Sequence, residues 1–311
     1  MEIISQLFSA LPGSVSQGLI WGIMAIGVYI TYRILDVSDL TVDGSFATGG
    51  AVAVMLILNG CDLWLAMLLA FLAGMLTGAI TGGLHIFMGI PPILAGILTQ
   101  LSLYSINLKI MDKANQSVNV NQTDLLISLR WVKEFALHNP LITVGIILVL
   151  LIAVLYWFFG TEMGCSIRAT GANVQMSRAQ GINTNFNKVL GIMISNGLVA
   201  FSGAFLAQYQ GFADVKMGQG AIVIGLAAVI IGEALFGKIF KNFALRLLSV
   251  VLGSVIYYIV IQAVITMGLD ANMLKLLSAV IVAVFLAIPY WKKQYAQRHM
   301  FRKGKGGAEN A

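Results

Sequence analysis

Charged residues are scarce in this chain, and their scarcity excludes a water-soluble fold. Asp, Glu, Lys and Arg together make up 10% of the 311 residues, whereas 59% are hydrophobic. A typical soluble domain carries about 25% charged residues. The stretch from Leu63 to Asn107 contains none of the four charged types, and it is long enough for two spanning helices of about 20 residues each. The lipid bilayer is therefore the expected solvent.

Residues that carry out chemistry are equally few. The two cysteines, Cys61 and Cys165, cannot form a disulfide framework, and we expect both to be unpaired. The three histidines, His85, His138 and His299, lack the spacing of metal ligands. No G-x-S-x-G nucleophile motif occurs. The sequence therefore predicts no catalytic residue, no metal site and no enzymatic activity.

A nucleotide site is also absent. Residues 232–239, GEALFGKI, imitate a phosphate-binding loop, but Ile239 stands where Ser or Thr must hold magnesium. We expect no cofactor on this chain, so ATP and Mg²⁺ would be bound by a partner ATPase. The predicted spans also lack the ladder of charged residues that marks many ion-coupled carriers. This argues against an ion-coupled secondary transporter, which stays open as an alternative.

The hydrophobic segments predict helices, because they are continuous and do not alternate with period two. The expected fold class is all-α, a polytopic transmembrane helical bundle of about nine segments, with eight to ten as the range. The segments lie near 14–33, 44–60, 63–83, 91–110, 141–159, 188–209, 218–236, 245–267 and 274–291. Residues 1–13 lack the basic start and apolar core of a signal peptide. They are compatible with a short amphipathic helix in the membrane interface.

The net charge of +6 is explained by membrane orientation, so no nucleic-acid partner is expected. Thirteen of the 19 basic residues fall on one side if the C-terminus is cytoplasmic, and such an excess marks the cytoplasmic face. These are Arg33, Arg168, Arg178, Lys188, Lys238, Lys241, Arg246, Lys292, Lys293, Arg298, Arg302, Lys303 and Lys305. We therefore predict an outside N-terminus, a membrane domain over 1–291 with a long outer loop at 112–140, and a basic cytoplasmic tail at 292–311.

Two glycine patterns bear on packing. Gly74, Gly78 and Gly82 lie on one helix face, where bare backbone lets another helix approach closely. The partner helix is expected within the same subunit, with a dimer seam as the alternative. The segments 40–55 and 215–237 are short, glycine-interrupted and oppositely directed, which favours an inverted repeat around a central solute path.

Polar residues near these two segments are the candidates for the path. Asp36, Asp39 and Asp43 are interpreted as a hydrated cytoplasmic loop with helix caps, or alternatively as the lining of an inner vestibule. Glu233 is expected to form a salt bridge with Lys238 or with a basic residue of a neighbouring loop. The candidate path residues are Asp43, Ser45, Thr48, Asn196, Gln208 and Glu233.

The loop between spans five and six, within 160–188, is unusually polar for this chain. Asn173 can cap a short helix from Val174 to Gln180, which Gly181 then ends. A short helix of this kind, extending from the membrane, is typical of a docking element for a partner.

The same loop carries a resemblance to a known family. The run Gly164-x-x-x-Arg168-Ala169-x-Gly171-x-Asn173, with Arg178 and then Ala179-x-Gly181-Ile182-Asn183, resembles the coupling loop of ABC importer permeases for branched-chain amino acids, ribose and similar solutes. The run from Leu35 to Phe46, LDVSDLTVDGSF, resembles a narrower branch of tryptophan/tyrosine-type, lipoprotein-dependent importers.

The resemblance implies a transport subunit in a bacterial cytoplasmic membrane. Two permease subunits, expected to be a homodimer, would form the pathway, and two ATPase subunits would dock on residues 162–183. An extracytoplasmic solute-binding lipoprotein would deliver the solute. An aromatic or branched-chain amino acid is the expected solute, with a sugar or a nucleoside as the alternative.

Overall fold

The computed structural model describes residues 2–118, 125–129, 132 and 139–267, together with isolated positions between 273 and 287. These residues are almost entirely helical. The elements are α1 (Glu2–Tyr29), the π-helical turn η1 (Ile30–Ile34), α2 (Val42–Leu58), α3 (Leu63–Ile86), α4 (Pro92–Met111), β1 (Asn115–Ser117), α5 (Pro140–Gly160), α6 (Glu162–Ala172), α7 (Val174–Ala179), α8 (Thr184–Gln210), β2 (Phe212–Asp214), α9 (Ala221–Phe236) and α10 (Phe243–Thr266).

Eight helices account for the first eight predicted spans, and the all-α prediction is confirmed. Six of them are long and apolar enough to cross a bilayer, whereas α2 and α9 have only 17 and 16 residues. The ninth predicted segment, 274–291, lies mostly outside the described residues, and so does the tail at 292–311. Residues 2–13 are helical and continue through Pro12 into the first span as one helix, α1.

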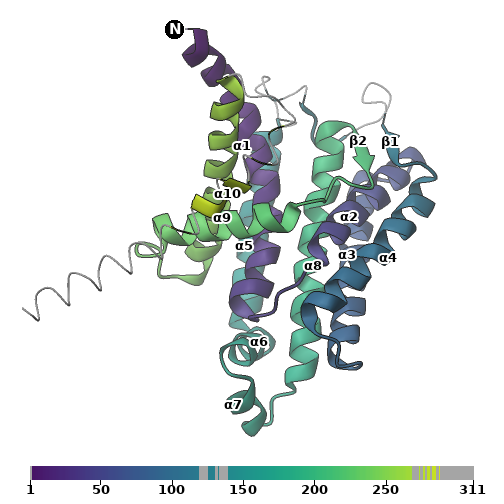
Figure 1. Cartoon of the computed structure of the whole chain (residues 1–311), viewed down its shortest axis with the longest axis vertical. Helices are drawn as coiled ribbons and strands as arrows, with labels where there is room; N and C mark the ends of the chain where they lie inside the picture. The colour runs from purple at the N-terminus through teal and green to yellow at the C-terminus, as the bar shows by residue number, and fades with distance from the viewer. Residues whose placement is uncertain are drawn as a thin grey trace, which may run out of the picture.

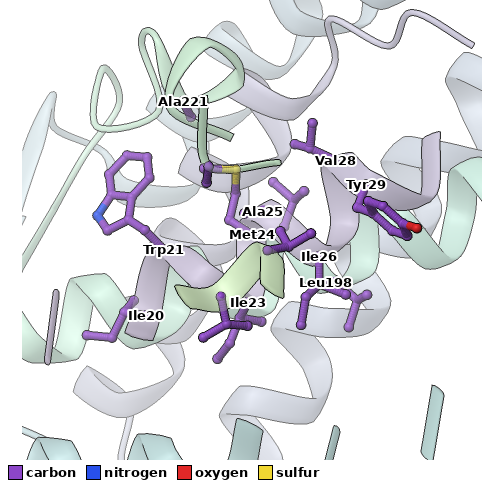
Figure 2. Close-up of a cluster of buried hydrophobic side chains, with 14 of the residues drawn as sticks. Ile20, Trp21, Ile23, Met24, Ala25, Ile26, Val28, Tyr29, Leu198 and Ala221 are labelled. Carbon is purple, nitrogen blue, oxygen red and sulfur yellow. The ribbon is translucent and has the colours of Figure 1, made fainter. Parts of the chain in front are cut away.

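The two central helices are α1 and α8. In the apolar window of each, 78% and 72% of the residues are buried, against 28–39% in the other four long helices. Figure 2 shows the consequence for α1, where labelled side chains from Ile20 to Tyr29 leave the helix in several directions and all meet protein. A helix that is apolar all round belongs in the interior of a bundle.

An inverted repeat relates the two halves of the bundle. The helices α1 and α8 run antiparallel, and the hydroxyls of Ser195 and Ser202 each donate at 2.7 Å to backbone carbonyls of α1, at Gly27 and Ile20. Each central helix is followed by a non-helical link, a short helix and another long helix. The first half thus reads α1–α2–α3, and the second half reads α8–α9–α10.

The contacts made by the first half of the bundle are repeated by the equivalent helices of the second half. The short helix α2 packs on α8, and α9 packs on α1, so each half places its short helix against the central helix of the other half. The long helices follow the same exchange, with α3 on α8 and α10 on α1. The start of α2 is buried, whereas α9 is only partly covered by this chain, with Val223 40% and Leu235 50% exposed.

Bare backbone makes these close contacts possible. Gly74, Gly78 and Gly82 all face α8, where a Cβ atom would meet the backbone near Asn196, Ile192 and Val189. The glycine row therefore packs inside the chain. On α2, a Cβ at Gly49 would collide with the carbonyl oxygen of Ala200.

The two ends of the molecule differ in character (Figure 1). At one end, β1 pairs antiparallel with β2, and Asn115 lies opposite Asp214. This small sheet joins the loop after α4 to the link after α8. At the opposite end, α6 and α7 project beyond the long helices. Cys61 and Cys165 are both free, as predicted.

The Gly49 contact gives a stability prediction. Gly49→Val places a branched side chain against the main chain of α8, and we expect the protein to lose about 3 kcal/mol of unfolding free energy. Gly145→Ala on α5 is the control, because its Cβ meets no atom within 4 Å, and a helical Gly→Ala change should be neutral or stabilising by about 1 kcal/mol. Thermal unfolding of both variants in detergent checks this, and equal melting temperatures would contradict the packing.

Candidate functional site

The links that lead to the two short helices, α2 and α9, both begin with a residue in the left-handed backbone conformation. After η1, Asp36 takes the left-handed conformation with φ +54°, and after α8, Gly211 does so with φ +80°. Each turn ends a central helix and starts a link that leads to a short helix. One face of the first link is buried, with Leu35, Val37 and Asp39 all below 7% exposed, whereas Asp36 and Ser38 are exposed. Such irregular backbone at membrane depth is tolerated only when protein surrounds it.

Asp43 joins the starts of the two short helices. It lies in the first turn of α2, and its carboxylate accepts hydrogen bonds from the backbone N–H groups of Gly220 at 2.9 Å and Ile222 at 3.0 Å. These N–H groups open α9 and have no partner within that helix. The negative charge also lies at the positive end of the α9 dipole. Asp43 therefore caps the short helix of the opposite repeat.

A network of buried polar side chains holds the first link in place. Asn196 of α8 donates to the Asp39 carboxylate at 2.6 Å and accepts from the Ser45 hydroxyl at 2.6 Å. The Asp39 carboxylate also accepts from the backbone N–H of Thr41 at 2.8 Å. Ser45 in turn contacts Thr77 of α3 at 2.6 Å. A second chain runs from Thr41 through Thr81 to Thr99.

This geometry corrects the interpretation of the aspartates as a hydrated loop. Asp39 is 3% exposed and bonded to Asn196, and Asp43 is occupied by the start of α9. Only Asp36 of the three is exposed to solvent. The sequence could not show this, because the partners of these carboxylates on α8 and at the start of α9 lie more than 150 positions away.

The other candidate path residues have separate environments. Thr48 donates to the carbonyl of Gly44 within α2, and Gln208 accepts from the backbone N–H of Leu126. Glu233 forms an ion pair with Arg33 at 3.0 Å. Its partner therefore comes from η1 and not from the neighbouring Lys238. Of the six candidates, Ser45 and Asn196 are brought together with each other, and Asp43 lies next to a cavity.

That cavity has a volume of about 130 Å³ and lies between α2, α4 and the link before α9. Its polar lining comes from Asp43, Gln100, Tyr104, Asn107 and Gln219. Asn107 was missed by the sequence analysis. The signal was nevertheless present, since Gln100, Tyr104 and Asn107 follow the helical spacing of one face of α4.

The polar loop at the projecting end folds as a chain of capped helices. Thr161 caps α6, Asn173 caps α7 by accepting from the N–H of Met176 at 3.0 Å, and Asn183 caps α8. The predicted short helix is thus present, and it ends at Ala179, one residue before the predicted end. Gly181 follows with φ +78°, a conformation that glycine adopts without strain.

The motif residues of this loop divide into inner and outer groups. A Cβ at Gly171 would collide with the carbonyl oxygen of Ile34, and one at Gly164 would collide with that of Phe158, so both glycines serve close backbone packing. Arg168 and Arg178 are exposed, but both hold the loop on neighbouring elements. The Arg168 guanidinium lies 5.4 Å from the ring centre of Phe243. Arg178 donates to Thr184 at 2.9 Å and fixes α7 on the start of α8.

The outer group forms the tip of the loop. Asn173, Ala179, Gly181 and Asn183 are exposed there, whereas Ala169 and Ile182 are half-buried. Two large apolar side chains, which the motif does not include, also face outward: Met176 is 60% exposed and Phe186 is 51% exposed. An exposed apolar pair rimmed by polar groups is typical of a protein contact surface.

The buried network gives a second prediction. Asn196→Leu removes three side-chain hydrogen bonds, with Asp39, Ser45 and the carbonyl of Ile192. It leaves Asp39 without one donor, so we expect about 3 kcal/mol of destabilisation. Gln210→Leu on the same helix is the control, because Gln210 is exposed and such changes stay within about 0.5 kcal/mol. Thermal unfolding in detergent measures both. If the two variants melted together, the network would not stabilise the first link.

Comparison with known proteins adds four findings. The family described as "Branched-chain amino acid transport system / permease component" matches residues 11–289. A tyrosine transport system permease protein of Clostridioides difficile is 38% identical, covering 90% of this chain and 91% of that protein. The uncharacterized protein RP368 of Rickettsia prowazekii is 34% identical, covering 88% and 95%. The fructose import permease protein FruF of Bifidobacterium longum is 29% identical, covering 85% and 73%.

Proposed function

Because the chain belongs to the branched-chain amino acid transport system permease family, it is the membrane-spanning permease of an ABC importer, and we propose that its solute is an aromatic amino acid. The observation that supports this solute is the 38% identity to a tyrosine permease over nine-tenths of both chains. The permease subunit is not an enzyme. It works with an ATPase and a solute-binding protein, and ATP with Mg²⁺ is held by the ATPase.

The docking site for the ATPase is the tip formed by α7 and the start of α8. Met176 and Phe186 offer apolar contact there, and three capped helix starts give the tip a defined shape. An exposed anchor on a rigid element is what a stable protein interface requires. Two ATPase subunits and two copies of this chain, each copy presenting one tip, make up the proposed assembly.

A path for the coupling leads from this tip to the middle of the membrane. Helix α6 contacts Ile34 through bare backbone at Gly171, and Asn187 of α8 donates to Thr170 of α6 at 3.1 Å. Ile34 directly precedes the link that holds Asp39. Movement of α6 therefore shifts the start of α2, whose Asp43 caps α9. Both short helices respond, which is a switch between packed states of one bundle.

The orientation follows from the docking proposal. With the ATPase in the cytoplasm, the end that carries α6 and α7 is cytoplasmic, and the β1–β2 end with the start of α1 faces outward. The N-terminus is then outside, whereas the tail at 292–311 lies outside the described residues. The excess of Lys and Arg supports the same direction.

A sugar is the second candidate solute, because the family also includes the fructose permease. The two solutes are separated by uptake into proteoliposomes that contain the permease, its ATPase and its binding protein. We expect ATP-dependent uptake of labelled tyrosine that excess phenylalanine reduces and excess fructose does not. Uptake of fructose alone would overturn the aromatic amino acid. Uptake by the chain without an ATPase, driven by an ion gradient, would instead favour a secondary carrier.

The tip gives its own prediction. Met176→Glu places a charge in the apolar contact, and we expect ATP-driven uptake to fall at least about tenfold, a loss of about 1.4 kcal/mol of binding or coupling. Met88→Glu is the control, since Met88 is 70% exposed on the link between α3 and α4 and lies outside the tip. Co-purification of the ATPase is measured alongside uptake. Retention of both by the Met176 variant would exclude this docking site.

A further inference from the structure

The polar cavity beside Asp43 has an unmet requirement for hydrogen bonds. Asn107 is 1% exposed, and neither its Nδ2 nor its Oδ1 atom has a hydrogen-bond partner within the described part of the chain. A buried amide without partners costs free energy. The amide lines the cavity, so a polar group that enters the cavity can supply the missing hydrogen bonds.

Asp43 gives the cavity one anionic wall. Both carboxylate oxygens accept from N–H groups that open α9, so the carboxylate is held in place at the cavity wall, and each oxygen keeps a second lone pair for another donor. Its charge is balanced only by helix dipoles, since no cationic side chain lines the cavity among the described residues. A ligand cation placed here gains an electrostatic partner that is already oriented.

The remaining polar lining consists of amides and a phenol. Gln100, Asn107 and Gln219 each offer amide N–H donors and a carbonyl acceptor, and Tyr104 adds a hydroxyl. A carboxylate needs donors, and an ammonium group needs acceptors. The cavity therefore presents an acceptor with full negative charge on one side and uncharged donors on the others, which suits a zwitterion.

The size of the cavity restricts what enters. A volume of about 130 Å³ corresponds to about four waters at their share of liquid volume. The five non-hydrogen atoms of an α-amino acid head group occupy a similar space, whereas an aromatic ring in addition does not fit. Leu101 and Tyr104, which also line the cavity, are 65% and 43% exposed on α4. A side chain attached to a bound head group would leave past these two residues.

From this geometry we propose that the cavity is a transient subsite for the α-ammonium and α-carboxylate head group of the transported amino acid. Asp43 binds the ammonium, and Asn107 with Gln100 and Gln219 binds the carboxylate. The subsite recognises the head group that all α-amino acids share and makes no contact that selects the side chain. This inference rests on the proposed function, because it assumes that the solute is an amino acid.

The start of both short helices contributes to the same subsite. Asp43 and Gly44 stand in the first turn of α2, and Gln219 immediately precedes the αL residue that opens α9. Transporters with broken helices place solute at such junctions, since helix N-termini there stabilise anionic groups. Binding at the junction also links the subsite to the elements that the coupling path moves.

Asn107→Leu tests the subsite by two readouts with opposite signs. The substitution is nearly isosteric and removes the unpaired amide, so the purified permease should melt a few degrees higher than the wild type. Uptake of tyrosine by the reconstituted importer should nevertheless fall at least about tenfold. Ser102→Leu, on the exposed face of the same helix, is the matched control and should leave uptake unchanged.

Three outcomes of this experiment would overturn the proposal. Wild-type uptake by the Asn107 variant would show that the cavity is not used. A lower melting temperature together with lower uptake would show a structural role, such as a buried water that Asn107 binds. An equal loss of uptake in the Ser102 control would show that uptake is sensitive to any substitution on α4, and not to the cavity in particular.

Ligand analogues test the head-group assignment directly. Millimolar tyrosine and phenylalanine should raise the melting temperature of the purified wild-type permease, whereas tyramine, 4-hydroxyphenylpropionate and fructose should not. The Asn107→Leu variant should lose the effect. Stabilisation by either single-headed analogue, or no stabilisation by any amino acid, overturns the subsite. If alanine and leucine stabilise the permease but tyrosine is not transported, the subsite stands and the aromatic solute is wrong.

Discussion

The carboxylate of Asp43 on the first N–H groups of α9 is the contact on which the arrangement of the bundle depends. A helix that begins inside a membrane exposes unpaired N–H groups, and lipid offers nothing to pair them. The chain breaks two helices in this way. It meets the requirement of α9 with a side chain from α2, so the two halves cannot separate without leaving both the charge and the N–H groups unpaired.

The other helices of the bundle hold α2 and α9 in the positions that this contact requires. The central helices α1 and α8 are buried along most of their length and are joined through serine hydroxyls. Each supports the short helix of the other half. The network around Asn196 fixes the link before α2, whereas the corresponding link before α9 is tied to the small sheet through β2. One link is therefore held near α6, which packs on Ile34, and the other near the β1–β2 end of the molecule.

The elements could be predicted from the sequence where a single local signal decides them. Apolar length located eight helices, six of which are long enough to cross a bilayer. Asn173 with Gly181 located α7, because caps and left-handed glycines act within a few residues. The site could be predicted only in part. Asp43 was recognised as a candidate, but its capping of α9 depends on a contact across 177 positions. The need of Asn107 for a partner is invisible until its neighbours are known, and Gly171 looked like part of a docking motif although it packs against Ile34.

The contact of Gly171 with Ile34 has a genetic consequence. Most tight contacts between side chains can be repaired, because enlarging one residue is balanced by trimming its neighbour. Here the neighbour is a carbonyl oxygen, which every amino acid carries, so no second substitution at Ile34 can make room. A screen for suppressors of a Gly171 variant should therefore return true revertants, or changes that shift whole helices, and none at the residue that is touched.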